Sequence, residues 1–134
     1  MDYRQARNYL LQRPEAREDF PFGPDVAVFK IDSKMFATLV EEDRLARMNL
    51  KCDPHEALML RDIFPAVVPG YHMNKTHWNT VYLDGSIPRG ELERMIDASY
   101  ALVVGKLTRK QRTALEVRHG REALYGTSAD PGQK

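Results

Sequence analysis

The chain has 134 residues, of which 43% are hydrophobic and 29% are charged, and its formal net charge is +1. This length and composition suit one domain with its own core and argue against intrinsic disorder. Cys52 is the only cysteine, which excludes an internal disulfide. No apolar run approaches the roughly 20 residues that cross a bilayer. Because the first residues also lack the apolar segment of a secretory signal, we expect a cytoplasmic protein with no membrane partner.

The net charge hides a gradient along the chain. Residues 21–105 contain nine Lys or Arg against twelve Asp or Glu, a balance of minus three, whereas residues 106–122 contain six against two. An acidic body argues against a polyanion-binding surface over the whole domain, so any nucleic-acid surface must be local. The basic run from Lys106 to Arg112 is typical of a solvated helix end, and phosphate binding is the alternative.

The N-terminal part predicts one helix and then a hairpin. Residues 2–12 place apolar side chains three and four positions apart, the pattern of an amphipathic helix, and Pro14 ends it. A proline-rich connector at residues 20–24 leads into two β-rich runs, 26–31 and 35–40. The three residues between these runs suit an antiparallel hairpin.

A third strand is predicted at residues 46–52, where apolar and polar side chains alternate. The polar positions are Arg47, Asn49 and Lys51, so one face of the sheet should be polar. A helix should follow directly, with Asp53 as its N-cap, Pro54 at its first position and a capping-box Glu56. Pro65 should end this helix after about Phe64.

The C-terminal part predicts a loop or short strand around residues 70–72 and a strand at residues 78–83. Pro88 should open a long helix whose apolar stripe covers the sheet, and a basic helical extension should reach about His119. The expected fold is α+β, a two-layer sandwich in the order α-β-β-β-α-β-β-α. Its antiparallel sheet has about five strands with helices on one face. Residues 1–118 should form the single domain, and residues 119–134 a partly disordered C-terminal extension with a frayed tail from Gly126.

Several segments together resemble the MmcQ/YjbR family. They are Pro21-Phe22-Gly23, Val28-Phe29-Lys30, Met35-Phe36-Ala37, Leu50-Lys51-Cys52-Asp53-Pro54, the block from Pro69 to Trp78, and Ser99-Tyr100-Ala101-Leu102-Val103. The match spans about residues 3–117, and the block from Gly70 to Trp78 is its most specific element. The resemblance implies an α+β fold like that of secretion chaperones, with a sheet compared to a double wing, and a DNA-binding function. It implies no base-reading residues and does not extend past about His119.

The candidate recognition surface combines the polar strand face with the histidine-containing block. Phosphates would be contacted by Arg47, Lys51, Lys75 and His77, and a base would stack on Trp78. The alternative is structural. In that interpretation Trp78 packs under a helix, His77 bonds loop carbonyls, and the two strand cations are solvated.

A metal or catalytic site is the competing chemical interpretation. Cys52, His55, His72 and His77 could supply a zinc ligand set, and Cys52 with a histidine could form a nucleophile and its base. However, Cys52 falls on the apolar strand face, and no complete set of nucleophile, base and orienting group is recognisable. We therefore predict no catalytic residue, no metal and no cofactor.

The sequence thus favours a non-catalytic DNA-binding module whose partner is nucleic acid. A protein-interaction or chaperone-like adaptor, with another protein as its partner, is the first alternative. A metal-dependent enzyme is a more distant one. The sequence does not fix the oligomeric state, and a monomer is favoured.

Overall fold

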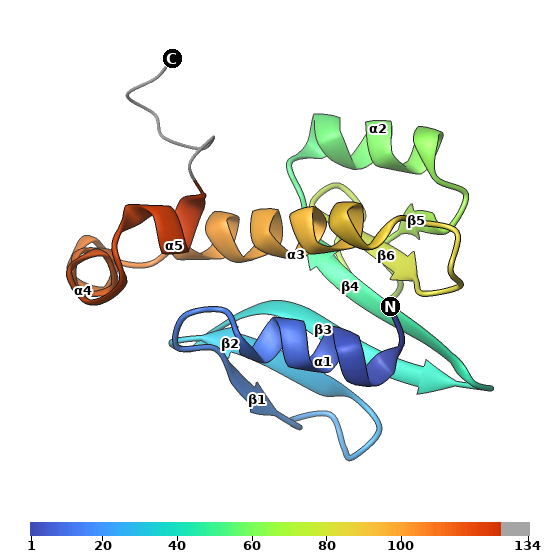
Figure 1. The fold of residues 1–134 in the computed structure, drawn as a ribbon, viewed down its shortest axis with the longest axis horizontal. Coiled ribbons are helices and arrows are strands. Elements are labelled where there is room, and N and C mark those ends of the chain that lie inside the picture. Colours follow the sequence, from blue (N-terminus) through green and yellow to red (C-terminus); the bar gives the residue numbers. More distant parts are fainter. Residues whose placement is uncertain (127–134) are drawn as a thin grey trace.

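A six-stranded antiparallel sheet and five helices make up residues 1–126, the part of the chain that the computed structural model describes (Figure 1). The strands are β1 (Arg17–Asp19), β2 (Ala27–Ile31), β3 (Lys34–Glu42), β4 (Leu45–Lys51), β5 (Val67–Pro69) and β6 (Trp78–Tyr82). The helices are α1 (Tyr3–Leu11), α2 (Pro54–Ile63), α3 (Arg89–Val104), α4 (Arg109–His119) and α5 (Arg121–Tyr125). The sheet order is β1-β2-β3-β4-β6-β5, and every neighbouring pair is antiparallel. The predicted α+β class is confirmed.

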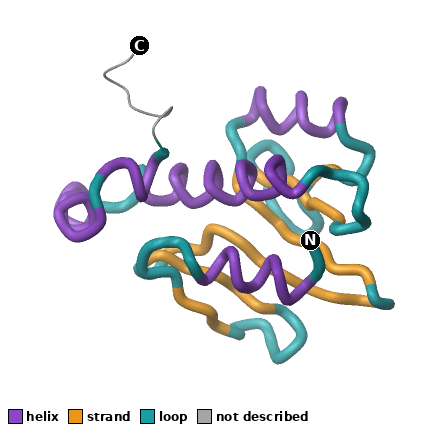
Figure 2. The backbone as a smooth tube through the Cα atoms, in the orientation of Figure 1, coloured by secondary structure: helices purple, strands orange, loops and turns teal. Residues whose placement is uncertain are grey.

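Helices α1 and α3 pack on the same side of the sheet, across β2, β3 and β4 (Figure 2). The apolar stripe of α3 lies in the core as predicted, since Leu92, Ile96, Ser99 and Val103 are all buried. Pro88 is the N-cap of α3 rather than its first helical residue. No helix of the described part is long and apolar enough to span a membrane.

Strand β1 is the element that the sequence did not predict. It reads Arg-Glu-Asp, so it has no apolar alternation to reveal a strand. Antiparallel pairing with β2 and two ion pairs hold it. Glu18 pairs with Arg7 of α1 at 2.7 Å, and Asp19 pairs with Lys30 of β2 at 2.9 Å. The proline-rich connector that was predicted at residues 20–24 therefore links two neighbouring strands of the sheet.

The hairpin of β2 and β3 has a tighter turn and a longer second strand than predicted. Only Asp32 and Ser33 separate the strands, and Asp32 has a φ of 54°, which Asp tolerates better than most residues. The register shifts so that Phe29 faces Ala37 and Lys30 faces Met35. The extra residue, Phe36, is fully buried.

Ser99 of α3 joins β3 to β4 at the point where their pairing stops. The last paired residues are Ala37 and Leu50. Beyond them, the Ser99 hydroxyl donates to the carbonyl of Phe36 at 2.5 Å and accepts from the backbone N–H of Lys51 at 2.8 Å. Ser99 is fully buried, and its hydroxyl fixes the backbone at the end of β4.

Helix α2 begins as predicted, with Asp53 accepting from the backbone N–H groups of His55 and Glu56. The predicted capping box is wrong in one respect. The Glu56 carboxylate does not return to Asp53 but pairs with Arg94 of α3 at 2.7 Å. The predicted strand around residues 70–72 is shifted as well, because Val67–Pro69 pair with β6 and the chain then turns at Gly70.

The folded part of the chain continues past the predicted boundary at residue 118. Leu124 of α5 is buried in the core, and the Tyr125 hydroxyl donates to Glu116 at 2.8 Å. The basic helical extension to His119 matches α4. Most of the predicted frayed tail, residues 127–134, lies outside the described residues.

Candidate nucleic-acid interface

Three side chains of β4 point away from α1 and α3. Arg47, Asn49 and Lys51 alternate with Ala46, Met48 and Leu50, which are buried in the core. In register with Asn49 lie Thr38 of β3 and Thr80 of β6. We call the face that bears Arg47, Asn49, Lys51, Thr38 and Thr80 the polar sheet face.

The loop of residues 70–77 folds over part of this face. The backbone N–H of Tyr71 donates to the Thr80 hydroxyl at 2.8 Å, and the Asn49 amide donates to the Tyr71 carbonyl at 3.2 Å. Gly70 permits this close approach, because a Cβ there would lie 2.8 Å from the Trp78 Cβ. The polar sheet face is therefore partly covered at its centre.

Tyr71 is 54% exposed on top of this loop. The guanidinium of Arg47 lies over it, 5.6 Å from the ring centroid, and the His72 ring lies 4.0 Å away at an interplanar angle of 48°. Tyr71 is the functional candidate that the sequence reasoning missed. Its place in a loop directly after Pro-Gly, outside any strand alternation, was the available signal.

The structure corrects the predicted role of Trp78. Trp78 lies opposite Lys51 in the pairing of β4 with β6, and both residues belong to the predicted recognition surface. However, Trp78 is only 9% exposed. Its ring is too deeply buried to serve as a stacking platform for a base, and the packing alternative fits it better.

The other predicted residues are distributed over the polar face and its covering loop. Arg47 and Lys51 are half-buried on the face itself, whereas Lys75 and His77 are exposed on the loop. The Lys75 ammonium donates to the Gly70 carbonyl at 3.0 Å. The His77 carbonyl accepts from the backbone N–H of Cys52 at 2.8 Å.

Lys34, Lys51 and Lys106 form a cluster that we call the cationic corner. Lys34 begins β3, Lys51 ends β4 and Lys106 follows α3. Burial lowers the pKa of the Lys51 ammonium, and the charges of Lys106 and Lys34 lower that pKa further. None of the three forms an ion pair with another residue in the range 1–126.

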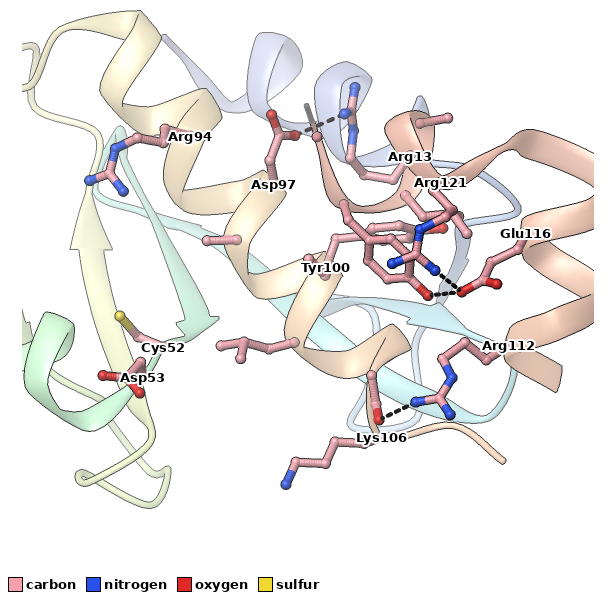
Figure 3. A pocket seen from close by; sticks show the side chains of 18 of the residues that line it. Arg13, Cys52, Asp53, Arg94, Asp97, Tyr100, Lys106, Arg112, Glu116 and Arg121 are labelled. Atoms are coloured by element: carbon pink, nitrogen blue, oxygen red, sulfur yellow. Dashed lines mark hydrogen bonds and ion pairs between the residues drawn. The ribbon is translucent and has the colours of Figure 1, made fainter. Parts of the chain in front are cut away.

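A groove of about 1270 Å³ runs along α3, between α2 on one side and α4 and α5 on the other (Figure 3). Three ion pairs lie in its lining: Arg94 with Glu56 at 2.7 Å, Arg13 with Asp97 at 2.8 Å, and Arg121 with Glu116 at 3.3 Å. The remaining cations of its lining are Lys106, Arg109 and Arg112. Lys106 thus belongs to both the groove and the cationic corner, and the groove is most positive at this end.

The geometry does not favour the metal and nucleophile interpretations. Within residues 1–126 no group of three or more His, Cys, Asp or Glu side chains is placed to hold a metal ion. Burial, together with the charges of Glu56 and Asp53, raises the pKa of the Cys52 thiol to about 11. At neutral pH this cysteine is a protonated, buried side chain rather than a thiolate nucleophile.

Comparison with known proteins gives concordant matches in sequence and structure. A family model described as YjbR matches residues 11–102. Uncharacterized protein YbdF of Escherichia coli O157:H7 is 38% identical over 107 residues, which cover 80% of this chain and 88% of that protein. Uncharacterized protein YjbR of Escherichia coli K12 is 32% identical over 115 residues, which cover 86% and 98%. These names state no ligand and no activity.

Two solved structures share the fold. Protein DR2400 of Deinococcus radiodurans, with a domain described as DUF419, superposes with a TM-score of 0.79 and 36% identity, covering 86% of this chain and 88% of that one. A crystal structure of a Pseudomonas syringae protein gives a TM-score of 0.69 and 31% identity, covering 76% and 98%. The family model spans β1 to β6 and most of α3, so it includes the strands that carry the polar sheet face. The chain therefore belongs to the YjbR family.

Proposed function

We propose that this protein is a non-catalytic nucleic-acid-binding module that holds DNA through phosphate contacts at the cationic corner. The observation that carries the proposal is the convergence of Lys34, Lys51 and Lys106 from three separate segments, with no carboxylate among the described residues paired to them. Arg109 and Arg112 extend this positive surface into α4.

The electrostatic energy of the three lysines is the physical reason to expect a phosphate at the cationic corner. Burial lowers the pKa of Lys51 most, and the like charges of Lys106 and Lys34 lower it further, so the charged form of Lys51 is disfavoured in the folded state. Eight of the other sixteen Lys and Arg side chains in residues 1–126 form an ion pair with an Asp or Glu. A phosphate group bound at the corner would supply the missing negative charge and release counterions from the nucleic acid.

The direct test is the salt dependence of DNA binding. Fluorescence anisotropy with a labelled oligonucleotide, measured between about 50 mM and about 200 mM salt, should show affinity falling steeply as salt rises. Replacing both Lys51 and Lys106 by Ala should reduce the slope of log K against log salt by roughly two, about one for each phosphate contact. Undetectable binding at low salt, or an affinity that does not change with salt concentration, would contradict phosphate contact.

A matched control comes from α1. Arg4 is exposed and forms no ion pair with another described residue, and it lies in α1, which contributes no residue to the cationic corner. Arg4→Ala removes one charge from the protein while leaving the corner intact. It should leave the salt slope unchanged, which separates local contact from net charge.

A protein-interaction or adaptor role is the second candidate, and α2 favours it. Leu58, Met59 and Ile63 are exposed by 61%, 60% and 60% on the outer side of this helix. Met59 and Ile63 are four residues apart and so share one helix face. Exposed apolar side chains gathered in this way are typical of a protein-binding surface. A pull-down from cell extract in which Met59→Glu recovers the same proteins as the unmodified chain would count against this role.

A further inference from the structure

We propose that the nucleic acid bound is single-stranded, with a base stacked on Tyr71 and the backbone following β4 to the cationic corner. This inference rests on the proposed function and adds the class of nucleic acid. Three features of the polar sheet face lead to it: a fixed exposed ring, a row of polar side chains, and the placement of the helices.

The Tyr71 ring is exposed although its backbone is held in place. Its N–H bonds the Thr80 hydroxyl, its carbonyl accepts from Asn49, and Gly70 behind it lies against Trp78. Tyr71 is nonetheless 54% exposed and takes no part in the core cluster. An exposed aromatic ring on a hydrogen-bonded backbone, with the Arg47 guanidinium over it and the His72 ring 4.0 Å away, suits stacking on a nucleic-acid base, because the backbone loses little conformational freedom on binding.

The two cations on β4 are spaced so that a single nucleic-acid strand could contact both. Arg47 lies over the Tyr71 ring, and Lys51 is four residues further along β4, about 13 Å away at roughly 3.3 Å per residue. Asn49 lies between them on the same face. From Lys51 the positive charge continues to Lys34 and Lys106. A strand of a few nucleotides could therefore place one base on the ring and its next phosphates on the lysines.

A duplex fits this surface less well. In a duplex both faces of each base are already stacked on neighbours, so a ring on a protein surface gains no stacking unless a base is first removed from the helix. Major-groove reading relies on a protruding helix or a two-stranded ribbon. Here α1 and α3 pack on the opposite side of the sheet, and β4 lies inside the sheet between β3 and β6. A sheet face with a stacking aromatic is a common arrangement among single-strand binders.

The test compares a labelled single strand with the duplex of the same sequence, each about 16 nucleotides long, by fluorescence anisotropy at low salt. The unmodified protein should bind the single strand more tightly. Tyr71→Ala should weaken single-strand binding by roughly tenfold and leave the weaker duplex binding unchanged, because one stacked base is lost. Tyr71→Phe keeps the ring and should retain the preference. Unchanged thermal unfolding of both variants would show that the fold is intact.

The outcomes separate the two proposals. If neither nucleic acid binds at low salt, nucleic-acid binding itself is wrong, and the single-strand inference is lost with it. If the single strand and the duplex bind equally well, or if Tyr71→Ala keeps the single-strand preference, only the single-strand inference is overturned. In that case Lys51→Ala with Lys106→Ala should still weaken both complexes.

Discussion

Two regions of the molecule differ in how their basic side chains are neutralised, namely the contacts that α1 and α3 make with neighbouring elements and the cationic corner. At the helix contacts, arginines bond carboxylates of neighbouring elements; the pairs are Arg7 with Glu18, Arg13 with Asp97 and Arg94 with Glu56. At the cationic corner, lysines from β3, β4 and the end of α3 crowd together without such partners in the described part of the chain. The first arrangement holds elements together, and the second costs folding energy that binding could recover.

The largest expected effect comes from the buried contact between β3 and α3. Phe36 is fully buried and meets the ring of Tyr100 edge-on, with centroids 5.3 Å apart. Phe36→Ala should lower the free energy of unfolding by about 3–5 kcal/mol, because it leaves a cavity in the core. Chemical denaturation measures this change. A loss below about 1 kcal/mol would contradict the packing described for the bulge.

The Ser99 bridge should have the next largest effect. Ser99→Ala leaves the Phe36 carbonyl and the Lys51 N–H without their shared partner in a buried place. We expect a loss of about 1–3 kcal/mol in unfolding free energy. Ser33→Ala, in the exposed turn between β2 and β3, is the matched control and should change stability by less than about 0.5 kcal/mol. Equal effects of the two substitutions would show that the bridge is not stabilising.

Lys51 should show opposite effects on stability and on binding. Its lowered pKa means that the folded state disfavours the charged form, so the charge destabilises the fold at pH values below the folded pKa. That penalty should disappear as pH rises through the folded pKa toward the ordinary value. Lys51→Met, which keeps the stem and removes the charge, should therefore raise the melting temperature slightly at neutral pH and weaken DNA binding.

Arg94→Met removes a paired cation, whereas Lys51→Met removes an unpaired one. Arg94 pairs with Glu56 and Glu91, so its loss should lower stability modestly and leave DNA binding unchanged. Thermal unfolding and anisotropy on the same two protein preparations give both readings. If the two variants behave alike in both measurements, unpaired and paired cations do not differ as described.

The smallest expected effect lies at the turn after α1. The hydrogen bond from Arg118 lowers the pKa of Glu15, and the bond from His119 lowers it further. The resulting stabilisation is present above the ordinary carboxyl pKa and is lost as pH falls through the lowered folded value. Glu15→Gln should flatten the acid end of the stability profile by a small amount, since the pair is exposed. An unchanged slope of stability against pH below about pH 4 would contradict this.

The sequence predicted the elements whose signals are local. The alternation around Arg47 and Lys51 identified β4 and its polar face, and Asp53 with Pro54 identified the start of α2. Strand β1 was missed because its three residues are all charged and are held by partners elsewhere in the chain.

The site was predicted only in part, because exposure and convergence depend on the tertiary fold. Trp78 and Tyr71 are both aromatics of the same block, yet one is buried beside Lys51 and the other stands on the covering loop. Lys34 and Lys106 are far apart in the sequence, and only the crossing of α3 over β3 and β4 brings them to Lys51. No local pattern carries that information.

The central claim is that nucleic acid binds on the polar sheet face and the cationic corner. Its most direct test is a titration of isotope-labelled protein with a short DNA single strand, followed by backbone amide chemical shifts in NMR spectra. The largest shifts should fall on Tyr71, Lys51, Lys34 and Lys106, and the amides of α1 should stay in place. Shifts confined to the exposed face of α2, around Met59, or no shifts at low salt, would contradict it.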